Sequence, residues 1–474
     1  MLYNPILSRF KPLKQATQSV FAFYDRTRLP DLHTLYEHPE HLPAAVRRSA
    51  LALRCLELLG PLDWNHFPER DLSHHWEPHP VRYAPFAAAC LIKLEHNLVS
   101  MGALRQYLLE HPVLVSLLGF DRQTDLPTSR HFTRLLRTIP NQVLQYLLGD
   151  TVRLLKEELA MRDIGLGECV SMDTKHILAF VKENNPKTYI KQDRFNKNRQ
   201  PAGDPDCKLG CKRRHNRRAS SQEPPEKTPT ENPLPADTVS IGEFYWGYAS
   251  GIVAAKVPEV GEIVLAELTL PFDRPDVAYF FPLMEMAEPR LGSKPRFGAF
   301  DAAYDAWYIY QYFHDAGGFA AVPFSERGGY KDRKFAENGA PFCQADLPMA
   351  LRYTFTSRSG LIKHQAQRYV CPLIFPEPTG HACPKDLDFT CTATLAAAEG
   401  SRLRYTLDRS SDEYKRVYSQ RTATERIFSQ AKALGIERPK LRNGQAIANL
   451  NTLIYTLLNL RTLRRIRKSQ RAAE

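Results

Sequence analysis

The sequence YSQRTATERIFSQAK, from Tyr418 to Lys432, has the spacing of a helix with one polar and one apolar face. Four polar residues stand at offsets of 0, 3, 7 and 14 along it: Tyr418, Arg421, Glu425 and Lys432. At about 100° per residue, these offsets fall within an arc of roughly 60°. The opposite face is apolar and comprises Val417, Ala423, Ile427, Ala431 and Leu434. Such a stripe is either a solvated face with ion pairs between neighbouring turns or part of a site. A metal-binding role for Glu425 would require further carboxylates at strand ends elsewhere in the chain.

A first candidate carboxylate lies in the run CVSMDTKHILAFV, where Asp173 interrupts an otherwise apolar strand. A carboxylate at such a position costs free energy unless it is paired or binds a cation. Two structural alternatives remain open, in which Asp173 caps a turn or pairs with Lys175. His176 is an odd number of residues away and is therefore expected on the other face of the strand.

A second candidate follows the short apolar strand from Phe297 to Phe300, which ends at Asp301. A helix is predicted from about Asp305 to His314, with Asp305 as its N-cap. A strand, an acid at its carboxyl end and then a helix is how α/β folds place a site. The runs FYWGYASGIVAAKV and GEIVLAELTL predict a preceding hairpin, so the expected order is β-β-β-α-β-α.

These three blocks together resemble the DDE transposases of bacterial insertion sequences that carry a Tyr-Arg-Glu-Lys signature. The signature spacing agrees at each step, because 421 − 418 is 3, 425 − 421 is 4 and 432 − 425 is 7. Asp173 followed by Thr-Lys is similar to the first acidic block of the family, and Asp301-Ala-Ala-Tyr304 is similar to the second. The resemblance implies an α/β fold with a ribonuclease H-like core, namely a mixed five-stranded sheet flanked by helices. It also implies an N-terminal helical domain and a mainly β insertion.

The resemblance further implies a two-metal-ion enzyme that cleaves DNA and transfers the cut strand into target DNA. Asp173, Asp301 and Glu425 would be the catalytic residues and would hold two Mg²⁺ ions, for which Mn²⁺ can substitute. Two aspartates and a glutamate suit Mg²⁺ because it prefers oxygen ligands and keeps several waters. Arg421 and Lys432 would bind phosphate oxygens, with Tyr418 packed nearby.

Residues 1–165 are predicted to form the helical DNA-binding domain. Helices are expected at Ala44–Leu59, Pro85–His96, Met101–Leu109, Val113–Leu118 and Asn141–Met161. The segment LPTSRHFTRLLRTIP predicts a short basic helix that Ser129 caps. Its Arg130 and Arg134 are candidate phosphate contacts, although an ordinary helical domain with exposed arginines remains an alternative.

The catalytic core is predicted to span residues 166–325 and 414–474, interrupted by the mainly β insertion at 326–413. Residues 183–240 lack periodicity and are expected to form a flexible loop. Its basic half, including Arg213 and Arg214, would either contact DNA or remain a solvated linker. The basic tail RTLRRIRKSQR has the same two readings, DNA contact or disorder. The insertion contains Cys343, Cys371, Cys383 and Cys391, with His381 nearby, and these are either buried thiols or a structural zinc site.

Composition agrees with a DNA partner, since 64 basic and 52 acidic residues give a net charge of +12. The expected partners are double-stranded terminal inverted repeats and target DNA, and a homodimer in the DNA complex is a hypothesis. No apolar run has the length of a membrane span, and no secretory signal is visible, so a cytoplasmic, nucleoid-associated bacterial protein is expected. Two alternatives stay open: a catalytically inactive or domesticated DNA-binding protein, and a ribonuclease H-like nuclease that only hydrolyses.

Overall fold

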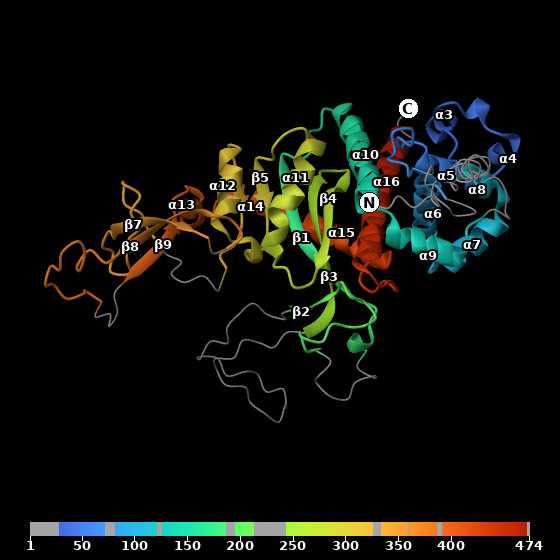
Figure 1. The fold of residues 1–474 in the computed structure, drawn as a ribbon. Coiled ribbons are helices and arrows are strands. Elements are labelled where there is room, and N and C mark those ends of the chain that lie inside the picture. The colour runs from blue at the N-terminus through green and yellow to red at the C-terminus, as the bar shows by residue number, and fades with distance from the viewer. Residues whose placement is uncertain are drawn as a thin grey trace, which may run out of the picture.

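The computed structural model describes residues 28–71, 81–120, 126–185, 195–212, 243–325, 333–358, 360–385 and 391–471. Within these residues the chain is α/β, with a mixed six-stranded sheet flanked by helices and a separate three-stranded sheet (Figure 1). The predicted α/β class is therefore confirmed at this level. Arg213 and Arg214 lie outside the described residues.

The central sheet contains three long antiparallel strands, one short antiparallel strand and two short parallel ones. Its strands are β1 (Cys169–Leu178), β2 (Lys208–Lys212), β3 (Glu243–Val257), β4 (Gly261–Pro271), β5 (Phe297–Ala299) and β6 (Phe319–Ala321). The order is β2-β3-β1-β5-β6, and β4 pairs with β3. β3 runs antiparallel to β1 and β4, whereas β5 runs parallel to β1 and β6. The predicted hairpin is β3–β4, and its turn includes two residues with positive φ, Glu259 at 63° and Gly261 at 119°.

The sixth strand corrects the prediction of a flexible loop for residues 195–212, while residues 186–194 and 213–240 of that predicted loop lie outside the described residues. Residues 195–212 are ordered, and β2 pairs with the first part of β3. Gly247 of β3 pairs with Leu178 on one side and with Lys208 on the other, so β2 continues the edge that β4 forms further along β3. A Cβ at Gly247 would stand 2.1 Å from the Ile177 carbonyl oxygen, which explains why this crossing point carries glycine. The sheet therefore has six strands rather than the predicted five, because β2 extends the edge that β4 forms.

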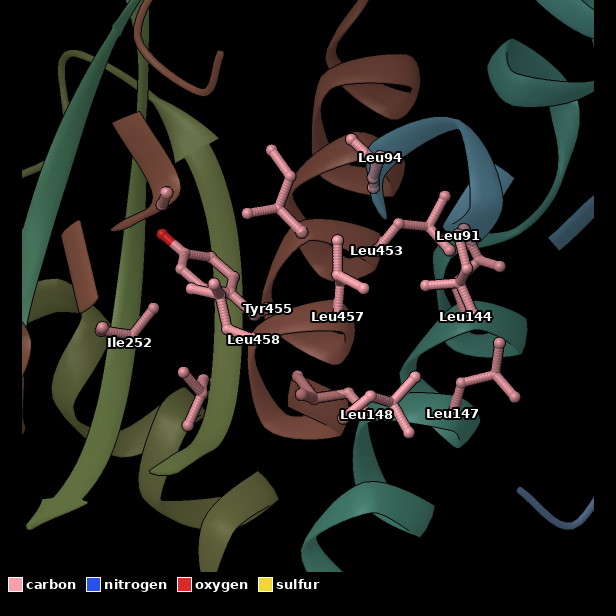
Figure 2. Close-up of a cluster of buried hydrophobic side chains, with 14 of the residues drawn as sticks. Leu91, Leu94, Leu144, Leu147, Leu148, Ile252, Leu453, Tyr455, Leu457 and Leu458 are labelled. Atoms are coloured by element: carbon pink, nitrogen blue, oxygen red, sulfur yellow. The ribbon is translucent and has the colours of Figure 1, made fainter. Parts of the chain in front are cut away.

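The helices that cover the sheet come from both halves of the chain. They are η5 (Asp276–Tyr279), α11 (Phe280–Leu291), η6 (Ala302–Tyr304), α12 (Trp307–Asp315), α14 (Asp412–Tyr418), η7 (Ser419–Arg421), α15 (Thr422–Ala433) and α16 (Gly444–Arg471). α16 lies between the sheet and the N-terminal helices (Figures 1 and 2). Figure 2 shows Tyr455 and Leu458 pointing toward the sheet, whereas Leu453 points toward Leu91 and Leu94 of α6. One hydrophobic core therefore runs from the N-terminal helices through α16 into the sheet.

Polar side chains of α16 also bind the sheet directly. Asn459 donates to the Val264 carbonyl at 2.8 Å and accepts from the Val264 amide at 2.9 Å, so its side chain pairs with β4 as a neighbouring strand would. Thr452 donates to the buried carboxylate of Glu267 on β4 at 2.8 Å. Burial raises the pKa of Glu267 to about 7. These bonds satisfy polar groups that would otherwise be costly to bury.

The described part of residues 28–165 is helical. Its helices are α3 (Leu32–Glu37), η1 (Pro39–His41), α4 (Ala44–Arg47), α5 (Ala50–Leu59), α6 (Tyr83–Glu95), α7 (Met101–Glu110), α8 (Pro112–Leu117), α9 (Ser129–Thr138) and α10 (Asn141–Ala160). The single helix predicted at Ala44–Leu59 is two helices, because the Ser49 hydroxyl caps α5 at the Ala52 amide. α9 is the predicted basic helix, but its cap is Thr128 rather than Ser129.

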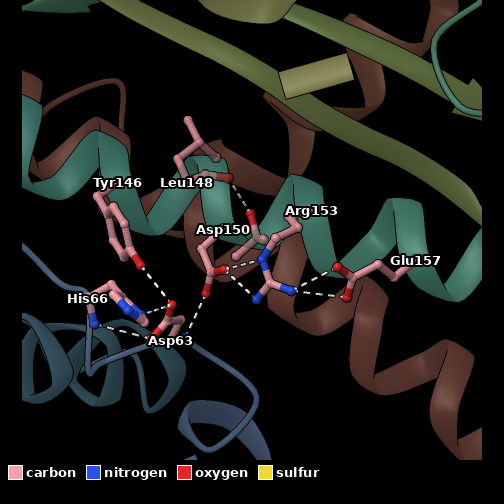
Figure 3. A network of polar contacts seen from close by, with 8 residues as sticks. Asp63, His66, Tyr146, Leu148, Asp150, Arg153 and Glu157 are labelled. Carbon is pink, nitrogen blue, oxygen red and sulfur yellow. Dashed lines mark hydrogen bonds and ion pairs between the residues drawn. The ribbon is translucent and has the colours of Figure 1, made fainter. Parts of the chain in front are cut away.

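α10 joins these helices to the sheet, since it packs along α16 and reaches β4 and α11. Figure 3 shows a polar network that fixes α10 to the turn after α5. Asp150 accepts from the Asp63 amide at 2.7 Å and from Arg153, and Tyr146 donates to Asp63 at 3.1 Å. Burial raises the pKa of Asp150, and the bonds from Asp63 and Arg153 oppose that rise. The N-terminal helices are therefore attached through buried contacts as well as through the chain.

The three-stranded sheet lies at the opposite end of the molecule from the N-terminal helices (Figure 1). Its strands are β7 (Ala350–Ser357), β8 (His364–Val370) and β9 (Thr392–Ala396), and α13 (Gly400–Thr406) follows. It occupies the place of the predicted β insertion. A 3-10 turn, η3 (Lys182–Asn184), completes the regular elements.

The basic tail is not disordered as far as Arg471, because it forms the last turns of α16. Arg461 and Arg464 bind the two carboxylate oxygens of Glu95 at 2.7 and 2.8 Å. Arg467 binds Glu158 on α10 at 2.5 Å. These arginines thus pair within the protein, and the disordered reading of the tail is wrong for the described residues.

Candidate active site

Asp173 lies on β1, and Asp301 lies two residues after the end of β5, the neighbouring parallel strand. Ser171 of β1 pairs with Ala299 of β5, and each aspartate stands two residues beyond its member of that pair. Since residues two apart share a face of a strand, the register directs both side chains to the same side of the sheet. The sequence predicted both residues, and the fold brings them together.

The electrostatics of the pair agree with this proximity. Burial, and secondly the negative charge of Asp301, raise the pKa of Asp173 to about 7, although the Thr174 amide, which donates to Asp173 at 2.7 Å, acts to lower it. Burial also raises the pKa of Asp301, whose Oδ1 accepts from the Ala303 amide at 2.8 Å as the cap of η6. Two like charges in a partly desolvated place destabilise each other, so the pair favours either a proton or a cation.

A third carboxylate belongs to this group and was missed by the sequence reasoning. Asp276 of η5 accepts from the Thr174 hydroxyl at 2.7 Å, and Thr174 is the residue next to Asp173. Burial raises the pKa of Asp276, and the charge of Asp301 raises it further. Asp276 lies in the segment FDRPDVAY between a strand and a helix, where no periodicity distinguishes it. Only the packing of η5 against η6 brings it near the other two aspartates.

The Tyr304 hydroxyl lies within the same group. Its side chain is fully buried, and among the described residues its hydroxyl has no hydrogen-bond partner. Burial raises the pKa of Tyr304, and the nearby charges of Asp276, Asp173 and Asp301 raise it as well. A buried hydroxyl that lacks a partner costs free energy, so its position beside three carboxylates calls for a bound group.

Glu425, the predicted third ligand, does not join the aspartates in this structure. Its carboxylate pairs with Arg421 at 2.6 Å, and its side chain is 51% exposed. Arg421 in turn lies near Asp173, whose charge raises the pKa of the guanidinium, as does that of Glu425. Arg421 therefore interacts with both Glu425 and Asp173.

The predicted helix from Tyr418 to Lys432 is interrupted, because α14 ends at Tyr418 and the 3-10 turn η7 precedes α15. Four of the five residues of its predicted apolar face are buried, and the fifth, Leu434, is half-buried. Tyr418 stacks on Tyr414 with 5.8 Å between ring centroids, and the Arg421 guanidinium lies 5.9 Å from the Tyr418 ring. Lys432 contacts Glu437 at 3.5 Å, and Glu437 also binds Lys175 of β1 at 2.5 Å. The alternative partner of Asp173, Lys175, is thus engaged elsewhere.

No family model, curated protein or solved structure matches this chain. The assignment of the site therefore depends on its own geometry and on the sequence blocks described above.

A divalent cation would suit the aspartate pair, because Asp173 and Asp301 are half-buried hard oxygen ligands whose charges repel. Among the residues that the structure describes, however, no three His, Cys, Asp or Glu side chains are grouped closely enough to hold a metal ion. Glu425 could complete a set of three only after leaving Arg421. The two aspartates suit a divalent metal ion, but Glu425, the expected third ligand, is paired with Arg421.

The loop that carries Asp301 is braced from the insertion. Asp305 is not the N-cap of α12, since that position is Ala306 and makes no side-chain cap. Instead, the fully buried Asp305 carboxylate pairs with Arg404 of α13 at 2.6 Å and accepts from the Ser325 amide at 2.7 Å. A partner 99 residues away thus overrode the local capping preference.

Other predicted residues lie on the surface. Arg130 and Arg134 are exposed on α9, as is Arg137.

His176 packs against Phe272 with 4.5 Å between ring centroids, and burial lowers its pKa to about 4, so it is structural as predicted. No helix among the described ranges is both long and apolar enough to cross a bilayer.

Proposed function

We propose that this chain is the transposase of an insertion sequence, with a ribonuclease H-like core that cleaves and joins DNA in a metal-dependent reaction. The observation that carries the proposal is the register of β1 and β5, because it brings Asp173 next to Asp301. The order β4-β3-β1-β5-β6, with the first three strands antiparallel and the last two parallel to β1, supports the ribonuclease H-like core.

In this proposal the chain's own residues bind and orient the phosphate. Asp173 and Asp301 would hold divalent ions, Mg²⁺ or Mn²⁺, which supply positive charge to the transferring phosphate when bound. Arg421 would exchange Glu425 for a phosphate oxygen of DNA, since a guanidinium binds both anions through similar hydrogen bonds. That exchange would free the Glu425 carboxylate to join the aspartates. DNA binding and completion of the site would then be coupled.

Basic groups outside the core would hold the rest of the duplex. Arg130 and Arg134 on α9 would contact phosphates of the terminal repeats, and Lys432 would contact DNA beside the site. Such contacts position the duplex without specifying its sequence.

A DNA-binding protein that does not cut is the second candidate, and the Arg421–Glu425 ion pair favours it. If that pair persists on DNA, only two of the three expected ligands are available. The two candidates differ in what DNA does to Glu425.

The test uses purified protein and linear DNA that carries the sequences flanking the gene, with Mg²⁺, with Mn²⁺ or with EDTA. We expect strand cleavage and joined products only with a metal ion. D173A, D301A and E425A should each lose activity by on the order of a hundredfold or more, which corresponds to several kcal/mol of transition-state stabilisation. D273N removes an exposed carboxylate from the turn before η5 and is the matched control.

Wild-type binding without cleavage under all metal conditions would favour the DNA-binding candidate. Cleavage without joined products would favour a nuclease that only hydrolyses.

A further inference from the structure

A basic cavity of about 780 Å³ lies where the last turns of α16 pack against the N-terminal helices α3, α5 and α6 (Figure 1). Six cationic side chains line it: Arg54 of α5 and Arg461, Arg464, Arg465, Arg467 and Lys468 of α16. Among the described residues, two carboxylates line it with them, Glu57 and Glu95. The α16 residues belong to the basic tail RTLRRIRKSQR, for which the sequence alone left DNA contact open.

Three of these cations are paired within the protein. Arg461 and Arg464 share the single carboxylate of Glu95, so their two positive charges face one negative charge. Arg467 pairs with Glu158 of α10. These pairs hold α16 against α6 and α10, and they leave the cavity with a surplus of positive charge.

The other three cations have no acidic partner in the part of the chain that the structure describes. Arg465 donates to the Val260 carbonyl at 3.1 Å, which leaves its charge uncompensated. Arg54 and Lys468 form no ion pair with a described residue. All three side chains are exposed, so a large anion can reach them. Cations gathered in this way repel one another, and a bound polyanion removes that repulsion.

The cations of α16 form a row along one face of the helix. Arg461, Arg465 and Lys468 stand at offsets of 0, 4 and 7, which a helix places within about 60° of one another. The row is about 10 Å long, because a helix rises by about 1.5 Å for each residue. One strand of duplex DNA carries a phosphate for every ~3.4 Å of its axis, so the row spans about three successive phosphates. A single free phosphate ion would meet only part of it.

We propose that this cavity binds the phosphate backbone of duplex DNA, chiefly through Arg54, Arg465 and Lys468. The inference rests on the proposed function, because it gives the same DNA a second contact surface on the protein. Asn449 of α16 binds the end of α9, and 468 − 449 is 19, so the cavity is about 28 Å further along the helix. It therefore contacts phosphates other than those that α9 would contact, and it does so without reading base sequence.

The experiment measures binding of the full-length protein to a labelled duplex that carries the sequence flanking the gene, in EDTA and over a range of potassium chloride concentrations. R54A/R465A/K468A should bind at least about tenfold more weakly than the wild type. Its plot of log K against log salt concentration should be less steep by about 2.7, which is 0.9 for each of three lost phosphate contacts. R54K/R465K/K468R keeps all three charges and should keep the wild-type slope.

A second variant acts in the opposite direction. E57Q removes an exposed carboxylate from the cavity and should bind the duplex roughly threefold more tightly at low salt. A misfolded protein would not show such a gain. If circular dichroism shows that R54A/R465A/K468A is unfolded, the E57Q measurement decides.

A folded R54A/R465A/K468A protein with the affinity and salt slope of the wild type would overturn the inference and leave the proposed function standing. An E57Q protein that binds no more tightly than the wild type would also overturn it. A wild-type protein that binds no duplex at any salt concentration would instead refute the proposed function, and the inference with it.

Discussion

Replacing Asp173 by Asn should stabilise the metal-free protein above neutral pH. The pKa of Asp173 is about 7 in the folded protein against an ordinary value of 3.8, mainly because the carboxylate is buried and secondly because Asp301 is close. Between these two values the folded protein keeps a proton that the unfolded chain has released. The free energy of unfolding therefore falls as the pH rises from about 4 to about 7, and the full penalty is present above pH 7.

The size of this effect follows from the same two values. Their difference, 7 − 3.8, is about 3.2, and at about 1.4 kcal/mol for each pH unit the penalty is at most ~4 kcal/mol. Asn cannot ionise, and its side-chain oxygen can still accept from the Thr174 amide. We expect D173N to unfold at a higher temperature than the wild type at pH 8 in EDTA, on the order of 5 °C, with the difference vanishing near pH 4.

The assay is thermal unfolding followed by circular dichroism between pH 4 and 9, with D273N as the control for loss of an exposed charge. Added Mn²⁺ should stabilise the wild type and leave D173N unchanged, which reverses their order. A D173N protein that is less stable than the wild type at pH 8 in EDTA would refute the reasoning. So would a stability difference that does not change with pH.

Three further predictions concern the neighbours of the aspartate pair. D276N should weaken Mn²⁺ binding several-fold in isothermal titration, because it removes one of the three charges around the cation, and an unchanged affinity would exclude Asp276 from the site. R421A should weaken DNA binding and reduce the salt dependence of the association constant by about one phosphate contact, whereas R421K should keep that slope. R404A leaves the buried Asp305 carboxylate unpaired and should destabilise the loop after Asp301 by about 3–5 kcal/mol. Hydrogen exchange of residues 300–306 measures this loss, and unchanged protection there would contradict it.

Local patterns were sufficient for the elements that carry Asp173 and Asp301. Both residues end or interrupt short apolar runs, and such runs predict a strand from the local sequence alone. The apolar face of α15 was equally visible, since its residues recur at helical spacing and are buried.

The remaining parts of the site depend on partners that are distant in sequence. Asp305 looked like a helix cap until Arg404 supplied a buried charge for it. The tail looked equally suited to disorder because its pairing partners, Glu95 and Glu158, are more than 300 residues away. Asp276 had no pattern at all, since its position follows from the packing of two 3-10 turns. Contacts between residues this far apart leave no local spacing pattern in a single sequence.

The helix α16 fixes the distance between α9 and the central sheet. Asn449 holds the end of α9 through the carbonyls of Leu136 and Ile139 at 2.9 and 2.8 Å, while Asn459 of the same helix pairs with β4. In the proposed function, a duplex bound to α9 would consequently reach Asp173 and Asp301 at a fixed distance and angle. The number of base pairs between a recognised sequence and the cleavage position would then be set by α16. A DNA substrate with a few extra base pairs in that interval could not be accommodated by rotation of the N-terminal helices relative to the sheet.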